Sequence, residues 1–272
     1  MIRFLFWNLN KKPLEARIAS LARHHDIDVL MFAECLIPVG RMLSTLFDGT
    51  GRAYRPSPSK RESLAVYTRF PGRSVPLLSE TKGNRLTVCD LVLPARPHVL
   101  LALAHLPSKL PWGDASQGFE CAEIARIIRG IEEEVGHSRT VLVGDFNMNP
   151  FEAGLVSANG FHGVMARRVA SRRSRVVQHR DYPFFYNPMW GHFGHGTDDP
   201  PGTYYYAGAE HVEYFWNTFD QVLVRPALLD NFPDDQVRIL DSDGSAPLVA
   251  STGRPDSANA SDHLPITFAL SL

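Results

Sequence analysis

The sequence predicts an α/β protein in which β-sheets pack together and are flanked by helices. Short apolar runs rich in β-branched residues recur along the whole chain, and each has the length of a β-strand. The first runs alternate with helix-like segments, whereas several runs between 63 and 104 follow one another without a helix. Such a mixture is typical of packed, mixed sheets with helices outside, and not of a purely parallel wound sheet.

Each apolar run is interpreted as one strand. The expected strands cover 3–7, 28–33, 63–68, 85–93, 99–104, 140–144, 220–224 and 264–270. Two helices are expected over 11–25 and 117–135, and Gly136 follows the second as a C-cap. The apolar face of the second helix would consist of Phe119, Ile124, Ile127, Ile128 and Ile131.

Two segments are expected to be loops because turn-forming residues dominate them. The segment 180–206 is rich in Pro, Gly, His and aromatic residues, and its rings would suit a binding wall. The segment 241–261 is rich in Ser, Asp, Gly, Pro and Ala, and is expected to be a flexible surface excursion.

Composition limits the classes of protein that the chain can represent. With 272 residues, 44% of them hydrophobic, the chain can bury a sizeable core, and we expect a single domain over 1–272. The formal net charge of -1 provides no general basic field, so a polyanion must be held locally. Neither a signal peptide nor a membrane span is expected, which favours a cytoplasmic protein, and we expect a monomer.

The three cysteines, Cys35, Cys89 and Cys121, are odd in number and far apart in the sequence. This spacing matches neither a disulfide framework nor a Cys-x-x-Cys metal knuckle. We interpret them as buried or idle thiols in a reducing compartment.

The most informative motif is Thr140-Val-Leu-Val-Gly-Asp-Phe-Asn147, an apolar strand that ends in an acid and an amide two residues apart. Strand geometry places Asp145 and Asn147 on the same side of the chain. The acid can bind a metal or accept a proton from water, and the amide can contact a phosphate or orient a nucleophile. A simple strand-to-turn cap is the alternative, because both residue types favour turns.

Other strand ends present residues of the same types. Glu34 follows the apolar strand Val29–Ala33, where a charge needs a salt bridge or a metal. Asp262 and His263 lie together before the last strand. Four further candidates are found at strand ends: His105, Asp220, Asn8 and Asn10. His105 alone is more typical of a hydrogen-bonded core residue, but the combined pattern is what Mg²⁺-assisted phosphoryl hydrolysis requires.

In this order, the motifs resemble those of the endonuclease/exonuclease/phosphatase family. The resemblance rests on Trp7-Asn-Leu-Asn10, Asp28 to Glu34, His105, Gly144-Asp-Phe-Asn147, Asp220-Gln-Val-Leu-Val224 and Ser261-Asp-His-Leu-Pro265, and spans nearly the whole chain. It implies a four-layer α/β sandwich of two mixed sheets face to face, with helices outside and a site at one edge. It also implies a metal-dependent phosphoesterase.

The resemblance also implies a role for each of these residues. Glu34 would be the principal metal ligand, helped by Asn8 and Asp262, and such oxygen ligands suit Mg²⁺ or Mn²⁺. Asp145 would orient or deprotonate the attacking water, and Asn147 would steady the water or the phosphate.

Three further roles come from the same resemblance. His263 would stabilise the pentacovalent phosphorane-like state, and Asp220 would fix its tautomer. His105 would act as an acid or as an electrostatic clamp near the phosphoryl or leaving group. Either Asp145 or His263 would be the general base, a choice that stays open at this level.

The sequence departs from the family pattern at two positions. Ala33 stands where a Gln commonly precedes the metal-binding Glu, and Asn10 stands where many DNA-repair members have an Asp. The second difference removes one carboxylate from the metal shell and argues against an abasic-site nuclease.

Several substrates fit this reading. The expected substrate is DNA or RNA, and the alternatives are a small phosphodiester, a nucleotide, a phosphoinositide or a phospholipid headgroup. The arginines between Arg167 and Arg180 could clamp phosphates, with the aromatic residues from Tyr182 to Trp190 stacking on bases. The alternative is a solvated surface with packed rings beneath it. Arg85 could also contact a phosphate.

Two other interpretations, a zinc site and a binding module without catalysis, have less support from the sequence. His192 and His195, with His179 and His211 nearby in the sequence, could suggest zinc, but their spacing is loose and no acidic or Cys partner is fixed to them. A catalytically lost binding module would not need the complete set of acids, amides and imidazoles that the chain retains.

Overall fold

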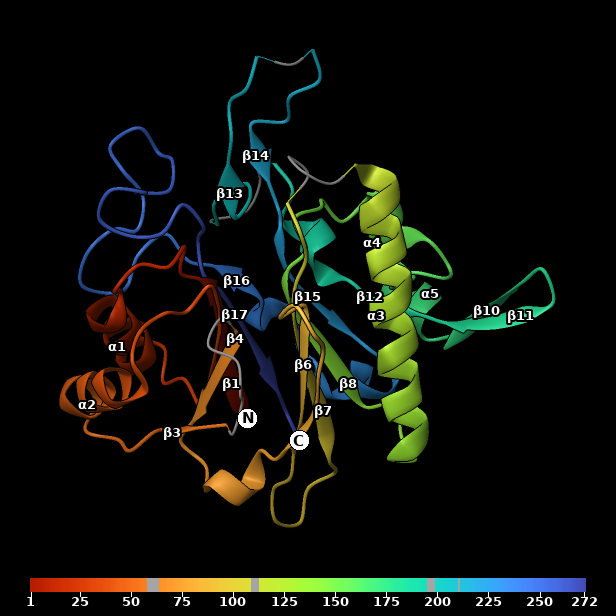
Figure 1. The fold of residues 1–272 in the computed structure, drawn as a ribbon, viewed down its shortest axis with the longest axis horizontal. Helices are drawn as coiled ribbons and strands as arrows, with labels where there is room; N and C mark the ends of the chain where they lie inside the picture. Colours follow the sequence, from red (N-terminus) through yellow and green to blue (C-terminus); the bar gives the residue numbers. More distant parts are fainter. Residues whose placement is uncertain (58–63, 109–112, 195–198, 210) are drawn as a thin grey trace.

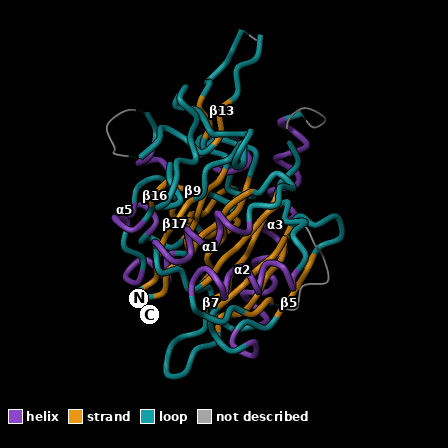
Figure 2. The backbone as a smooth tube through the Cα atoms, turned by 90° about the vertical axis from the view of Figure 1, so that its left-hand side faces the viewer, coloured by secondary structure: helices purple, strands orange, loops and turns teal. Residues whose placement is uncertain are grey.

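Two mixed β-sheets lie face to face in the computed structural model, which describes residues 1–57, 64–108, 113–194, 199–209 and 211–272 (Figure 1). Helices α1 (Glu15–His24) and α2 (Val39–Thr50) cover the outer side of the first sheet, and α3 (Asp114–Glu134) covers that of the second (Figures 1 and 2). The predicted α/β architecture of two flanked sheets is confirmed.

The first sheet has the strand order β16-β17-β1-β2-β4-β3. Its strands are β1 (Ile2–Asn8), β2 (Val29–Ala33), β3 (Arg55–Pro56), β4 (Leu64–Thr68), β16 (Arg238–Ile239) and β17 (Ile266–Leu270). β1 and β2 are parallel, and β17 runs antiparallel to β1. The central strands are apolar at nearly every position because both faces of the sheet are covered.

The second sheet has the order β5-β6-β7-β8-β15-β12-β9. Its strands are β5 (Leu77–Glu80), β6 (Leu86–Leu91), β7 (Val99–His105), β8 (Thr140–Asp145), β9 (Gly163–Val164), β12 (Phe185–Tyr186) and β15 (Asp220–Val224). β7 and β8 are parallel, and β15 is antiparallel to β8.

Shorter elements lie outside the two sheets. They are the hairpins β10 (Ser174–Val177) with β11 (Arg180–Pro183) and β13 (Tyr204–Tyr205) with β14 (Trp216–Asn217), the helices α4 (Ala153–Val156) and α5 (Arg167–Ala170), and the 3-10 turns η1 (Gly72–Ser74), η2 (Pro188–His192), η3 (Pro226–Asn231) and η4 (Asp234–Gln236). In Figure 1 the β13–β14 hairpin stands above the sheets, and the chain termini lie at the opposite end.

Two buried clusters hold the layers together. The larger joins residues of both sheets and includes the stacked rings of Phe4 and Phe268, whose centroids are 4.8 Å apart. The smaller lies between the second sheet and α3, where Ile124 and Ile128 of the helix share a cluster with Leu142 of β8. In the described part of the chain, no helix combines the length and the apolar character needed to cross a membrane.

All eight predicted strands are found, and both predicted helices exist within a few residues of their expected bounds. Gly136 caps α3 in a left-handed conformation, with its N–H donating to the carbonyl of Glu133. Phe119 was expected on the apolar face of α3, but its ring points into solvent. Helix α2 was not predicted, because Gly40, Gly49 and Thr50 weaken its helical signal.

The loop expected over 180–206 is wrong for much of its length. It contains β11, β12, η2 and β13, and the buried rings of Phe184, Phe185 and Tyr186 are not available to a binding wall. The segment 241–261 does lack helices and sheet strands, yet the carboxylates of Asp243 and Asp256 accept hydrogen bonds from backbone N–H groups and hold it in place.

Candidate active site

The sheet topology brings the predicted site residues to one edge of the sandwich. The parallel pairs β1–β2 and β7–β8 end at this edge, and the antiparallel strands β15 and β17 begin there. In the second sheet, His105 and Asp220 are the register partners of Asp145 on its two sides. In the first sheet, Asn8 pairs with Ala33, the residue before Glu34. Residues far apart in sequence therefore meet between the two sheets.

Asp145 lies at the centre of this arrangement. Its Oδ2 accepts a hydrogen bond of 2.9 Å from Nδ2 of Asn8, which links the two sheets. Its Oδ1 accepts a 2.9 Å bond from the backbone N–H of Asn147. Nδ2 of Asn147 donates to the carbonyl of Leu106 at 2.9 Å and lies 3.3 Å from Oδ2 of Asp145. The carboxylate is buried and fixed in one orientation, as a group that positions water must be.

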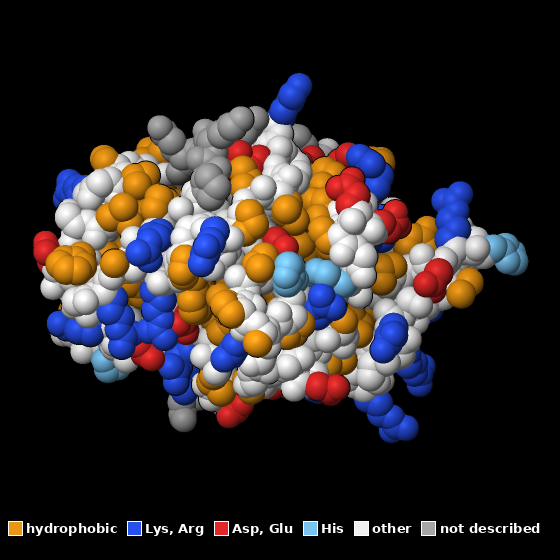
Figure 3. Space-filling model, turned by 90° about the horizontal axis from the view of Figure 1, so that it is seen from below, with side chains coloured by type: hydrophobic (Ala, Val, Ile, Leu, Met, Phe, Trp, Pro, Cys, Tyr) orange, Lys and Arg blue, Asp and Glu red, His pale blue; other side chains and the backbone are white. Residues whose placement is uncertain are grey.

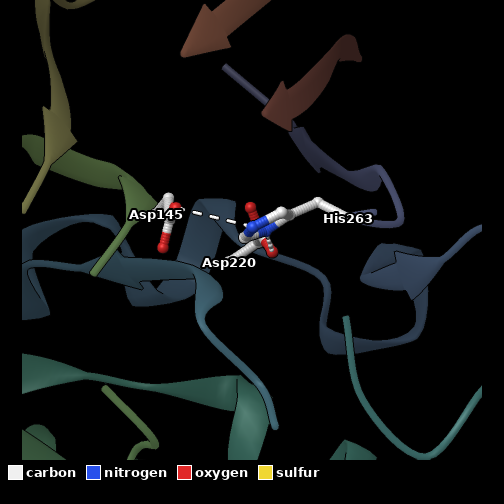
Figure 4. A group of neighbouring side chains, drawn as sticks. All are labelled: Asp145, Asp220 and His263. Carbon is white, nitrogen blue, oxygen red and sulfur yellow. Dashed lines mark hydrogen bonds and ion pairs between the residues drawn. The ribbon is translucent and has the colours of Figure 1, made fainter. Parts of the chain in front are cut away.

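His263 and Asp220 form a buried pair beside Asp145 (Figure 4). Nδ1 of His263 lies 2.8 Å from Oδ2 of Asp220, and Nε2 lies 3.9 Å from Oδ2 of Asp145. Ligand atoms of these three residues fall within 4.8 Å of one another, a spacing that a metal ion could use. Because Nδ1 is already engaged by Asp220, we interpret the cluster as a hydrogen-bonded relay with Nε2 left to face the substrate.

The charges around His263 favour its protonated form. Burial alone would lower the pKa of His263, but the charges of Asp220 and Asp145 and the hydrogen bond with Asp220 raise it to about 10. Burial raises the pKa of Asp220, and His263 offsets part of this effect. The second oxygen of Asp220, Oδ1, is buried without a hydrogen-bond partner in the described structure.

His105 bridges the two sheets on the side of Asp145 opposite Asp220. Its Nε2 lies 3.6 Å from Oε1 of Glu34 and 3.7 Å from Oδ2 of Asp145. Arg85 is next to it, because the N–H of His105 donates to the carbonyl of Arg85 and Nη1 of Arg85 lies 3.5 Å from the carbonyl of His105. Both predicted residues are therefore at the same edge of the sandwich.

The predicted metal ligands, Glu34, Asn8 and Asp262, offer hard oxygen donors, the kind that a divalent cation such as Mg²⁺ prefers. Among the described residues, the partly exposed carboxylate of Glu34 makes only two ion pairs, with His105 and, at 3.7 Å, with Nζ of Lys11. Oδ1 of Asn8 accepts one bond from the N–H of Asn10 and keeps a free lone pair. Oδ1 of Asp262 lies 3.3 Å from the hydroxyl of Ser261, and the charge of Asp262 contributes to the raised pKa of His263.

Four of the described non-glycine residues with positive φ lie at this edge. Glu34, Asn147, Asn10 and Lys11 all have φ between 47° and 58°, a region that residues other than glycine rarely occupy. Such conformations persist where the surrounding structure holds them, and they are common at functional sites.

Several residues that support the site were not singled out from the sequence. The indole N–H of Trp7 donates to the carbonyl of His263, and the hydroxyl of Ser261 donates to that of Asn8. Both lie within the recognised motifs. Two further supporting residues lie in the segment 180–206, which the sequence marked as aromatic-rich without distinguishing them. The hydroxyl of Thr203 accepts the backbone N–H of Asp220, and the ring centre of Tyr204 is 4.7 Å from that of His263.

The arginine-rich segment does not lie beside the site. It forms α5 and the β10–β11 hairpin, which leads into β12, and Tyr186 of β12 pairs with Val224 at the end of β15 opposite Asp220. Arg167 donates to the carbonyls of Leu229 and Phe232 and is part of the fold. Figure 3 shows the hairpin projecting from the side of the molecule, with basic and acidic side chains mixed over the face opposite the β13–β14 hairpin.

The histidines that could have suggested zinc do not assemble. His192 lies 3.3 Å from Asp199, His179 is exposed in the turn of the β10–β11 hairpin, and His211 is exposed in the β13–β14 hairpin. His195 lies outside the described residues. In the described ranges, the grouping of possible metal-binding side chains is the one around Asp145. The three cysteines are buried and free, as predicted.

Comparison with known proteins identifies the family. The model of the Endonuclease/Exonuclease/phosphatase family matches residues 5–263. The chain belongs to this family. The match contains the motifs on which the sequence resemblance rested, apart from the last two residues of Ser261–Pro265. It makes the protein an enzyme that hydrolyses a phosphoester bond with a divalent metal.

Solved structures show the same fold at low sequence identity. An endonuclease/exonuclease/phosphatase family protein from Leptotrichia buccalis has a TM-score of 0.60 at 13% identity, over 100% of both chains. D. rerio TDP2 complexed with single-strand DNA product has a TM-score of 0.58 at 14% identity, over 100% of this chain and 99% of that one. An AP endonuclease from Archaeoglobus fulgidus has a TM-score of 0.57 at 13% identity, over 100% of both. No curated protein matches the sequence.

Proposed function

We propose that this enzyme is a nuclease that hydrolyses phosphodiester bonds of DNA or RNA with Mg²⁺ or Mn²⁺. The observation that carries the proposal is the cluster in which Asp145 lies between Asn8, His105 and the His263–Asp220 pair. The choice of a nucleic-acid substrate is supported by the structural neighbours, which include an AP endonuclease and a TDP2 complexed with single-strand DNA product.

The residues divide into two functional groups. Asp145, fixed by Asn8 and by the N–H of Asn147, orients the attacking water and takes its proton. His263 donates from Nε2 to the phosphate oxygen on which charge accumulates, and Asp220 holds its other nitrogen. The geometry favours this assignment, because Nδ1 is engaged by Asp220 at 2.8 Å and Nε2 is the nitrogen left to donate.

Glu34, Asn8 and Asp262 would hold the metal. A divalent cation bound there supplies positive charge to the phosphate oxygens and so lowers the cost of the charge that develops in the transition state. His105, placed between Glu34 and Asp145, would contact the phosphoryl or leaving group, and Arg85 would support it from the neighbouring strand.

A substrate panel with defined metal content tests the proposal. After dialysis against EDTA, the enzyme is supplied with Mg²⁺, Mn²⁺ or no metal, and offered single-stranded DNA, duplex DNA, RNA, inositol phosphates and phosphatidylcholine vesicles. We expect metal-dependent cleavage of at least one nucleic acid. Turnover of only a lipid or inositol phosphate would overturn the choice of substrate, and full activity in EDTA would overturn the metal requirement.

A further inference from the structure

Four aromatic rings, three of them exposed and one half-buried, form a group beside the catalytic edge. Its members are Phe151, Trp190, Phe193 and Tyr214, which we call the aromatic platform. The ring of Phe151 is 5.5 Å from that of Tyr214, 5.9 Å from Phe193 and 6.3 Å from Trp190, measured between centroids. None of the four belongs to a buried core cluster. Phe151 is 37% exposed, Phe193 38% and Tyr214 55%.

The platform is joined to the catalytic residues through the β13–β14 hairpin and the loop after β8. Phe151 follows Asn149, whose side chain bonds to Oδ1 of Asn217 in β14 and accepts the N–H of Thr218. On the other strand, Tyr204 pairs with His263. β13, which contacts His263, and β14, which is followed by Asp220 at the start of β15, therefore support the loop that carries Tyr214. Figure 1 shows the two strands side by side.

Hydrogen bonds also order the hairpin that carries Tyr214, as a stacking surface requires. Both oxygens of Glu213 accept backbone N–H groups of the hairpin, from Gly208 at 2.8 Å and Phe215 at 3.2 Å. The N–H of Tyr206 donates to the carbonyl of Phe215 across the hairpin at 2.8 Å. Exposed rings fixed in this way offer contact area at a low cost in conformational entropy.

The lack of basic residues on the platform indicates which kind of ligand it binds. The four platform residues carry no charge, the described part of the hairpin between 206 and 215 contains no Lys or Arg, and Glu213 is acidic. A surface for anionic lipid would combine its rings with basic residues. Stacking on a nucleobase needs no charge, because every base has a flat face that can lie on an aromatic ring.

We propose that the aromatic platform binds unpaired nucleobases next to the scissile phosphate, so that the substrate is a single-stranded nucleic acid or a single-stranded part of one. This deepens the proposed nuclease function and rests on it. In a duplex the base faces are covered by neighbouring pairs, so the rings can reach only unpaired bases. With a net charge of -1 and the arginine-rich hairpin at the far end of β15, stacking supplies affinity that phosphate contacts cannot.

Binding without cleavage tests this directly. A fluorophore-labelled single-stranded oligothymidylate is titrated in EDTA with the wild type, Tyr214→Ala, Phe151→Ala and the control Phe47→Ala. Phe47 is 56% exposed on α2, outside the first sheet. We expect the two platform variants to bind about tenfold more weakly, with unchanged Tm, and the control to bind like the wild type. An oligonucleotide with abasic linkers in place of bases should bind all four proteins equally weakly.

The outcomes separate this inference from the proposed function. If the wild type cleaves single-stranded DNA but both platform variants bind and cleave it normally, the platform is not a base site although the nuclease function holds. If no nucleic acid is cleaved, the nuclease function itself fails. Equal affinity of the wild type for the abasic and the base-bearing oligonucleotide overturns the stacking inference. Tyr214-dependent binding to phosphatidylcholine vesicles, without base-dependent binding, assigns the surface to membranes and overturns it too.

Discussion

The pair formed by Asp220 and His263 acts as one unit if their 2.8 Å contact sets the orientation of the imidazole. His263→Ala should lower kcat by about 10² or more, because it removes a donor that acts in the transition state. Asp220→Asn should give a milder loss, because the ring stays but its tautomer is no longer fixed. The double variant should be hardly slower than His263→Ala. A double variant that shows the product of the two single losses would mean that the residues act independently.

Glu34 should matter for the metal more than for the fold. Its carboxylate makes only long ion pairs with His105 and Lys11 among the described residues, so little of the structure depends on it. Glu34→Gln keeps the shape but loses the charge, and we expect weaker Mn²⁺ binding in calorimetry with an almost unchanged Tm. Glu80→Gln, on β5, serves as the control. Unchanged Mn²⁺ affinity in Glu34→Gln would remove this residue from the metal site.

At the scale of elements, backbone strain at Phe215 in the β13–β14 hairpin should lower the stability of the protein. Phe215 has φ 61°, a conformation that costs free energy in any residue with a Cβ, and half of its ring surface is exposed. Phe215→Gly and Phe215→Ala lose the same ring contacts, but only glycine relieves the strain. Phe215→Gly should therefore be more stable than Phe215→Ala by about 1 kcal/mol in chemical denaturation. Equal stability would show that the turn relaxes without cost.

The buried carboxylate of Asp243 attaches the segment 241–261 to α1. The stability that this attachment gives the fold therefore depends on pH. Asp243 bonds to Arg17 at 2.8 Å and accepts the N–H groups of Ser245 and Ala246. Burial alone would raise the pKa of Asp243, but these bonds outweigh it and lower the pKa below its usual value. The stabilisation is therefore complete above the unfolded-state pKa and is lost as the pH falls through the folded-state pKa.

Asp243→Asn should reduce the free energy of unfolding by about 1–3 kcal/mol at pH 7. The difference from the wild type should shrink below about pH 4, because Asp243 is protonated there in the unfolded chain before it is in the folded protein. Denaturant titrations of both proteins at several pH values measure this. A difference that stays constant down to pH 3 would show that the ionised carboxylate is not what attaches the segment.

At the scale of the whole molecule, the sequence predicted those strands and helices that a local pattern of apolar residues indicates. The runs that form β1, β2, β7, β8 and β15 are apolar at most of their positions, so their identity as buried strands follows from composition alone. The polar residues that end them could be read as one site because strand ends meet at a sheet edge. The single domain, the monomeric state and the compartment stay predictions.

What the sequence could not predict depends on contacts between distant segments. Phe119 fits the helical spacing of α3 but lies on the side facing away from the second sheet. Trp190 and Tyr214 meet through Phe151, and no periodicity in the sequence links those three positions. The arginines of 167–180 follow the Asp145 motif in sequence, yet β12 carries them away from it, because its partner residue Val224 is at the other end of β15.

This placement changes the expected role of those arginines in substrate binding. Asp220 and Val224 are four residues apart on β15, or about 13 Å at the rise of an extended strand, and the hairpin lies beyond Val224. A variant with Arg172, Arg173, Arg175 and Arg180 replaced by Gln should therefore keep the KM of the wild type for a short single-stranded oligonucleotide. The slope of log KM against log salt concentration should also stay the same, because each phosphate contact that is lost would reduce it by about 0.7 for a single strand. Arg85→Gln, next to His105 at the catalytic edge, provides the comparison in which the slope should fall. A lower slope in the four-arginine variant would mean that the substrate reaches the hairpin, and that its path extends from the catalytic edge along the second sheet.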